Sequence, residues 1–156
     1  DSGLFLMDVE ESDQVPARIV LPSERFMVLV IWDCEDRSNE EVMAMAETLV
    51  DSGMSYFCSS GRGASLLENA VDLALVTRQL DGIFSEDVLV MTTSHEEEPL
   101  DEALWFLLNS AYPDESMAAG CGSQLVLQVG GSERVASRVK FALKHPSEFS
   151  DQVHPA

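Results

Sequence analysis

The stretch FMVLVIWD, from Phe26 to Asp33, is a continuous apolar run that ends in a charged residue. Such a run is typical of a strand inside a parallel sheet, where helices cover both faces of the strand. The chain continues through SNEEVMAMAETLVDSG, in which apolar residues recur at helical spacing. Ser38 and Glu41 have the spacing of a capping box, and Gly53 is typical of a helix end. We therefore predict a strand that is followed directly by a helix.

The same unit of a strand and a helix recurs three more times. The further strands are predicted at residues 54–60, 87–93 and 123–131, and the further helices at residues 65–82, 99–113 and 132–145. Each helix is long enough to carry the chain back across the sheet, so the strands are expected to run parallel. We predict a small three-layer α/β/α domain, flavodoxin-like or Rossmann-like, with the strand order 2-1-3-4. The residues expected in its core are Val28, Leu29, Val30, Phe57, Leu89, Val90, Leu125 and Leu127.

The segments on either side of this repeat are harder to place. Residues 1–25 contain LFLMDV and RIVL, which predict either an additional edge strand or an extension that lies over the core. Residues 26–146 are predicted to form the single α/β domain. Residues 147–156, which follow the last predicted helix, are expected to be a frayed tail.

The chain is strongly acidic: 28 Asp and Glu residues stand against 9 Lys and Arg residues, for a net charge of -19. Nucleic acid is not an expected partner, because neutralising phosphates requires clustered cations. A basic protein is the expected partner, and a homo-oligomer is left open. Near the C-terminus, a basic segment either balances the acidic body from a solvated helix face or contacts an acidic partner or a second copy. Its members are Arg134, Arg138, Lys140 and Lys144.

Apolar runs and cysteines indicate the compartment. The longest apolar run, Phe26 to Trp32, is far shorter than the ~20 residues that cross a bilayer, and no secretory signal is visible. We therefore expect no membrane partner. Cys34, Cys58 and Cys121 are odd in number and lack the C-x-x-C spacing. Free thiols in a cytoplasmic protein are the expectation.

The predicted strand order places a polar crevice between the strands at 26–32 and 87–93. In a parallel sheet, ligands bind beyond the carboxyl ends of the strands, where the chain changes its direction along the sheet. The candidate catalytic residues there are Asp33, Glu35, Cys58, Thr92, Thr93, His95 and Glu98. The candidate ligands of a divalent cation are Asp33, Asp36, His95 and Glu96, since carboxylate oxygens and imidazole bind such ions.

Four of the candidate catalytic residues have a specific proposed task. Thr92 and Thr93 would hydrogen-bond a substrate or its phosphate, and Glu98 would act as a base on a metal-activated water. Cys58 precedes the turn SSGRG, so its thiolate would lie near the guanidinium of Arg62, which favours the charged form. The cofactor stays unknown: neither a dinucleotide-binding nor a P-loop pattern occurs, so those two kinds of chemistry lose their best support.

A purely structural interpretation of the same segment is also open. Ser94 and Glu97 have the spacing of a second capping box, and Glu98 precedes a proline suited to the first position of a helix. Acidic residues at a helix N-terminus are stabilised by the helix dipole. On this interpretation the segment only starts a helix, and His95 has no task of its own.

The segment TTSHEEEPLDEA, residues 92–103, also carries a resemblance. It is similar to a family of small bacterial proteins of unknown function in which T-T-x-H-x-x-E-P-L-x-E-A recurs. The resemblance covers most of the chain from Phe26 onward. The chain differs from those relatives at Ser59 and Ser94, where they usually have tryptophan. The residues that match its pattern are Cys58, Asp72, Thr92, Thr93, His95, Glu98 and Glu102. It implies an α/β fold and points to the same crevice, but it implies no reaction.

Two functions from different classes follow from the sequence. The first is a noncatalytic acidic interaction module of the bacterial cytoplasm, a regulator or an immunity-type inhibitor that binds a basic protein. The second is a metal-dependent hydrolase or phosphoryl-transfer enzyme, with its site at the carboxyl ends of the strands at 26–32 and 87–93.

Overall fold

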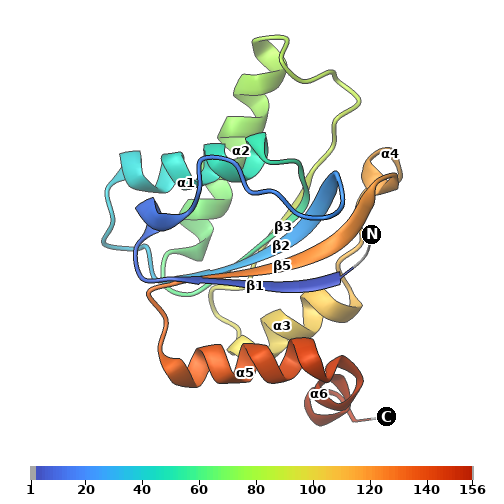
Figure 1. The fold of residues 1–156 in the computed structure, drawn as a ribbon. Coiled ribbons are helices and arrows are strands. Elements are labelled where there is room, and N and C mark those ends of the chain that lie inside the picture. Colours follow the sequence, from blue (N-terminus) through green and yellow to red (C-terminus); the bar gives the residue numbers. More distant parts are fainter. Residues whose placement is uncertain (1–2, 156) are drawn as a thin grey trace.

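Five parallel strands form the centre of the molecule in the computed structural model, which describes residues 3–155 (Figure 1). In chain order they are β1 (Gly3–Val9), β2 (Arg25–Trp32), β3 (Met54–Ser60), β4 (Met91–Ser94) and β5 (Cys121–Val129). Their order in the sheet is β1-β5-β2-β3-β4, and every neighbouring pair is parallel. The predicted α/β class is therefore confirmed, and the N-terminal segment does supply an edge strand.

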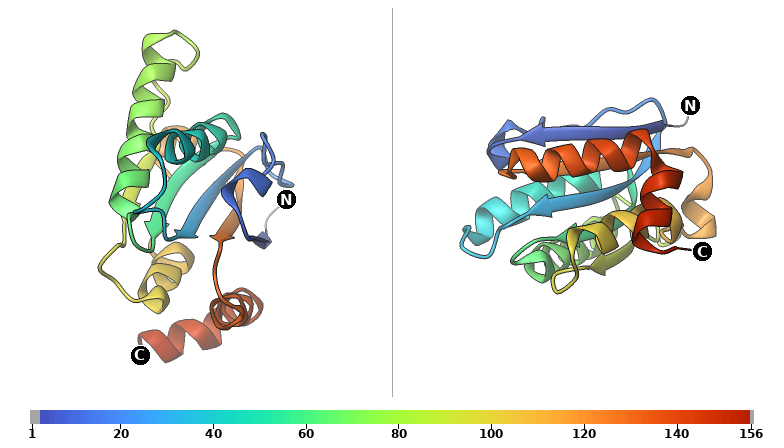
Figure 2. Two further views of the ribbon diagram at one scale, coloured as in Figure 1. Left: turned by 90° about the vertical axis from the view of Figure 1, so that its left-hand side faces the viewer. Right: turned by 90° about the horizontal axis from the view of Figure 1, so that it is seen from below.

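Helices cover both faces of this sheet (Figure 2). One face is covered by α1 (Asn39–Asp51) and α2 (Ala64–Leu80), and the other by α3 (Leu100–Asn109) and α5 (Glu133–Lys144). Two short helices lie in the connections, η1 (Ser12–Gln14) and α4 (Glu115–Ala118). The predicted cap of the first helix is confirmed, because the Ser38 side chain accepts a hydrogen bond from the Glu41 amide at 3.1 Å.

The predicted strand order 2-1-3-4 is wrong. That order places the strand at 26–32 beside the strand at 87–93, whereas β2 lies between β3 and β5 and β4 forms an edge. Strand length and polarity explain the difference. Residues 125–129 of β5 are all buried, which suits a central strand, whereas β4 has only four residues with the sequence MTTS, which suits an edge. The predicted crevice between the first and third strands therefore does not exist.

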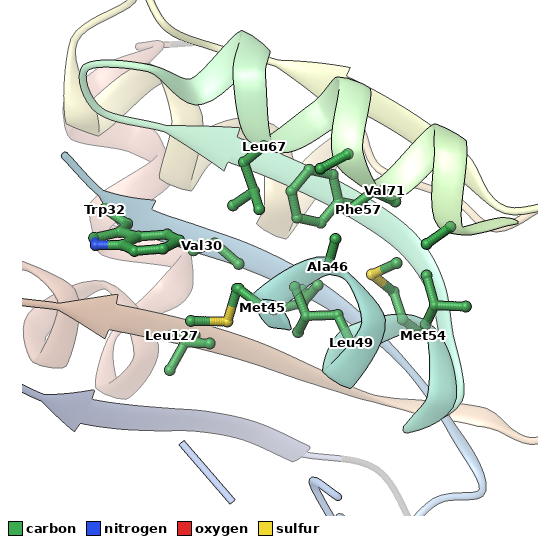
Figure 3. Close-up of a cluster of buried hydrophobic side chains, with 14 of the residues drawn as sticks. Val30, Trp32, Met45, Ala46, Leu49, Met54, Phe57, Leu67, Val71 and Leu127 are labelled. Carbon is green, nitrogen blue, oxygen red and sulfur yellow. The ribbon is translucent and has the colours of Figure 1, made fainter. Parts of the chain in front are cut away.

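The larger apolar core lies between the sheet and the helices α1 and α2, and Figure 3 shows part of it. Phe57 and Val30 from the sheet are fully buried there, together with Leu49 of α1 and Val71 of α2. Six of the eight predicted core residues are fully or almost fully buried. Leu89 is a wrong prediction: it is 50% exposed, because β4 starts only at Met91 and the preceding residues lie outside the sheet. Val90 is partly buried against the same core.

The C-terminal segment is not frayed as predicted, because residues Pro146–Val153 form helix α6. Phe149 anchors this helix: its side chain is fully buried, and the guanidinium carbon of Arg138 lies 4.7 Å from the centre of its ring. Arg138 also binds Asp101 of α3 with two hydrogen bonds, of 2.9 and 3.0 Å. This member of the basic segment thus joins α3, α5 and α6.

Two further expectations concern thiols and membranes. All three cysteines are unpaired, which confirms the expectation of free thiols; Cys34 and Cys58 are buried, and Cys121 is partly exposed. In the part of the chain that the structure describes, no helix combines the length and the apolar character needed to span a membrane.

Candidate functional site

The parallel sheet brings three acidic loops to one edge of the molecule. Because all strands point the same way, the loops that follow β1, β2 and β4 leave from the same edge of the sheet. Eight exposed carboxylates in these loops form what we call the acidic edge. Its members are Glu10, Glu11, Asp33, Glu35, Asp36, Glu96, Glu97 and Glu98.

The basic side chains at this edge are already paired with carboxylates. Arg62, in the loop after β3, binds Glu35 through a direct ion pair. The Arg37 guanidinium lies 3.6 Å from a carboxylate oxygen of Glu11 and 3.8 Å from one of Glu41. These exposed pairs neutralise some of the charge, but within the described residues Glu11 and Glu35 are the only two of the eight carboxylates that form an ion pair with an arginine.

The loops after β2 and β3 are held together by backbone contacts. The carbonyl of Arg62 accepts hydrogen bonds from the amides of Cys34 and Glu35 at 2.8 and 3.2 Å, and the Arg62 amide donates to Asp33 at 2.9 Å. Gly61 and Gly63 permit this approach, since both have positive φ angles and a Cβ on Gly63 would lie 2.6 Å from the Glu35 nitrogen. The turn SSGRG is therefore a brace between two loops.

His95 is the centre of a buried polar network, contrary to the interpretation that gave it no task. Its side chain is only 4% exposed, and its ring lies 4.7 Å from the ring of Phe106. One ring nitrogen, Nε2, is 2.9 Å from the Thr93 hydroxyl, and Nδ1 is 3.0 Å from a Glu98 carboxylate oxygen. A carboxylate can only accept, so Nδ1 carries a proton and donates to Glu98.

This network extends to the neighbouring elements. The backbone amide of His95 donates to the carbonyl of Ser59 in β3 at 2.7 Å, which continues the β3–β4 pairing by one residue. The Thr92 hydroxyl donates to Asp72 of α2 at 3.0 Å. These contacts fasten the short edge strand to both the sheet and α2.

The predicted capping box at Ser94 is wrong. Helix α3 begins at Leu100, its N-cap residue is Pro99, and Ser94 belongs to β4. Ser94 instead hydrogen-bonds the Ser65 hydroxyl at 3.1 Å. The chain between the strand and the helix forms the His95 network, and the N-cap of α3 therefore lies at Pro99, five residues beyond the predicted cap.

Glu96 caps a different helix from the one expected. Helix α2 starts after Gly63, which has no side chain to offer, and the Glu96 carboxylate accepts a hydrogen bond from the Ser65 amide at 3.0 Å. Backbone hydrogen bonds from Ser65 and Gly63 hold the pKa of Glu96 below its usual value. A carboxylate from the loop after β4 thus completes the N-terminus of α2.

Cys58 does not have the environment of a reactive thiolate. It is fully buried, and burial raises its pKa to about 12, with a smaller opposing effect from a hydrogen bond to Thr93. Arg62, the predicted activating cation, is turned outward to Glu35. The thiol of Cys58 is a core group beside the Thr93 hydroxyl.

The predicted metal ligands do not converge. Asp33 follows β2 and His95 follows β4, and β3 lies between these strands, which sets them about 10 Å apart at the sheet. Both ring nitrogens of His95 are already used by Thr93 and Glu98. Within residues 3–155, no three or more His, Cys, Asp or Glu side chains are grouped so that they could hold a metal ion.

A pocket lies where the chain does change direction, between β2 and β5. It has a volume of about 470 Å³, and its walls combine apolar residues with Glu10, Asp33, Arg37 and Ser132. Of these, only Asp33 was singled out from the sequence. The others were missed because the wrong strand order kept β5 away from β2, although the GGS turn after a buried strand was a usable signal.

Comparisons with known proteins give one match. The model of a family described as Domain of unknown function (DUF7684) matches residues 4–145, which reach from β1 to the end of α5. No curated protein and no solved structure matches the chain.

Proposed function

The chain belongs to the DUF7684 family, whose description names no activity, and we propose that it is a noncatalytic interaction module whose acidic edge binds a basic protein. The proposal includes a regulatory or inhibitory role of the immunity type in a bacterial cytoplasm. One observation carries it: exposed carboxylates from three separate loops gather at a single edge, while Arg37 and Arg62 beside them are paired.

The contacts of the residues that a catalytic site would need support a noncatalytic function. The residues that match the resembled pattern mostly join elements to one another: Thr92 binds Asp72, and His95 binds Thr93 and Glu98. Glu102 likewise receives a hydrogen bond from His154 beyond α6 at 2.9 Å. Groups that are occupied in this way stabilise the scaffold that presents the acidic edge.

A titration tests the acidic edge directly. When decalysine is added to the isotope-labelled protein at low salt, we expect the shifted backbone amide signals to cluster in the loops after β1, β2 and β4. The shifts should shrink with added salt, as the Debye length falls from ~10 Å at 0.1 M to ~3 Å at 1 M. Shifts spread evenly over the surface, or confined to another face, would contradict the proposal.

A charge-matched pair of variants sharpens this test. The first variant removes three charges from the acidic edge: Glu10→Gln, Asp36→Asn and Glu97→Gln. Within residues 3–155 these three side chains form no hydrogen bond or ion pair, so their replacement should leave the fold intact. Glu24→Gln, Glu115→Gln and Asp151→Asn remove three exposed charges elsewhere. We expect only the first variant to bind decalysine several-fold more weakly, because local charge and not net charge determines binding at the edge.

Hydrolysis is a second candidate, favoured by one observation. The order Thr93 hydroxyl, His95 imidazole and Glu98 carboxylate is that of a nucleophile, a base and an orienting acid. The test is the rate of p-nitrophenyl acetate hydrolysis with and without Mg²⁺, Mn²⁺ and Zn²⁺. We expect His95→Gln to leave the slow rate unchanged under every condition; a rate that depends on His95 would replace the interaction module by an enzyme.

A further inference from the structure

A row of exposed apolar side chains follows helix α2 and has no partner within the described chain. Leu66, Leu73, Val76 and Leu80 are separated by seven, three and four residues, which places them on one side of the helix. They are 50%, 55%, 50% and 82% exposed, and Ile83, just beyond the helix, is 64% exposed. We call these five residues the apolar stripe.

The stripe is unusual for a helix in this fold. The opposite side of α2 already supplies the core, with Leu67, Val71 and Ala74 almost completely buried. The end of α2 and the loop that follows it project away from the sheet, in the view of Figure 1 and again in the left view of Figure 2. A row of exposed apolar side chains on such a projection, here interrupted by the exposed Asn69 between Leu66 and Leu73, is typical of a contact site for another molecule.

Charge identifies the kind of molecule. Between residues 64 and 90 the acidic residues are Glu68, Asp72, Asp81, Glu86 and Asp87. Arg78 is the single basic residue in this range, and it is already bound to Asp51 at 2.8 Å and to Glu47 at 3.4 Å. Within residues 3–155 none of these five acidic residues forms a salt bridge, so the stripe is bordered by negative charge that is not neutralised there. A second copy of the chain would bring the same charges against it, whereas a basic segment would be attracted.

We propose that the apolar stripe of α2 binds an amphipathic helix of a partner protein, whose apolar face covers the stripe and whose lysine or arginine residues meet the acidic border. From Leu66 to Leu80 the stripe is ~21 Å long, which matches about four turns of such a helix. Because α2 begins at the carboxyl edge of the sheet, the partner helix reaches the acidic edge at the Leu66 end. This inference rests on the proposed function and names the partner's chemistry.

The probe is a synthetic helical peptide of about 18 residues with leucine on one face and lysine on the other. Its control is a scrambled peptide of the same composition, which carries the same charge without an apolar face. We expect the wild-type protein to bind the amphipathic peptide at least tenfold more tightly than the scrambled one at 0.15 M salt, measured by fluorescence anisotropy.

Matched variants locate the binding surface. Leu73→Gln with Leu80→Gln changes two exposed stripe residues, and the expected result is loss of the tenfold preference while circular dichroism stays unchanged. Val20→Gln with Met91→Gln changes two exposed apolar residues outside the stripe, 81% and 42% exposed, and should keep the preference. An equal loss in both variants, or no preference in the wild type, overturns the inference.

Two further outcomes are decisive. If decalysine does not bind the acidic edge, the proposed function fails; if decalysine binds but the amphipathic peptide has no advantage, only the present inference fails. Sedimentation gives the remaining control. A wild-type dimer that the Leu73→Gln and Leu80→Gln variant converts to a monomer would assign the stripe to a second copy of this chain.

Discussion

Replacing Gly63 by alanine is expected to lower the free energy of unfolding by about 2 to 5 kcal/mol. Gly63 has a φ of +86°, a conformation that costs an alanine roughly 1 to 2 kcal/mol. Its Cβ would also lie 2.6 Å from the Glu35 nitrogen and 2.8 Å from the Glu35 Cα. These are backbone atoms that cannot turn away, so the loops after β2 and β3 must separate, at a further cost of about 1 to 3 kcal/mol.

Urea unfolding measures this effect, and Gly82→Ala is the matched control. Gly82 also has a positive φ, of +73°, but a Cβ there would have no atom within 4 Å. The control should therefore lose only the conformational part, roughly 1 to 2 kcal/mol. If the two variants lose the same amount, the close packing of the two loops does not contribute to stability.

Replacing His95 by alanine is expected to cost about 2 to 4 kcal/mol. The change removes both hydrogen bonds of the ring, including the one to the Thr93 hydroxyl, and opens a space beside Phe106. Thermal unfolding followed by circular dichroism measures the loss. The continuation of β4 next to Ser59 should loosen at the same time, which hydrogen exchange of the His95 amide reports.

Ser94→Ala is the control for this measurement, and the expected order of the two effects is the reverse of what the capping pattern predicts. A lost N-cap costs about 1 kcal/mol, but Ser94 is not a cap, and within the described residues its side chain makes one exposed hydrogen bond, to Ser65. We expect a change below about 0.5 kcal/mol. A larger loss for Ser94→Ala than for His95→Ala would contradict the buried network.

The sequence was sufficient to predict the class of fold, and its periodicity was reliable where elements are long and buried. The run at Phe26–Trp32 is apolar throughout, the run at Leu125–Val129 is apolar except for Gln128, and the structure makes both of them central strands. Strand order was not predictable in the same way, because both orders use parallel strands and both are compatible with right-handed connections. What distinguishes them is the polarity of MTTS at β4, a signal of only four residues.

The site was predictable only in part, for a related reason. Parallel strands place all their carboxyl ends together whatever their order, so the acidic residues after β2 and β4 were rightly expected at one edge. Which of them touch depends on the neighbours, and β3 keeps Asp33 away from His95. The pattern Ser-x-x-Glu at Ser94 has the right letters for a cap, but local spacing cannot reveal that His95 is drawn into the interior by Thr93 and Glu98.

The pairing of β1 with β5 has a consequence for how the chain acquires its structure. Gly3 pairs with Ser123 and Val9 with Val129, so the first strand adds to the sheet only through the last one. β2 likewise lacks its neighbour on one side until β5 has been synthesised. In contrast, β2, β3 and β4 are consecutive both along the chain and in the sheet. Contacts so distant along the chain are slow to form, because a long loop must close before they stabilise anything. During synthesis, the β2–β4 part can assemble first, and the N-terminal strand has to remain unpaired until nearly the whole domain has left the ribosome.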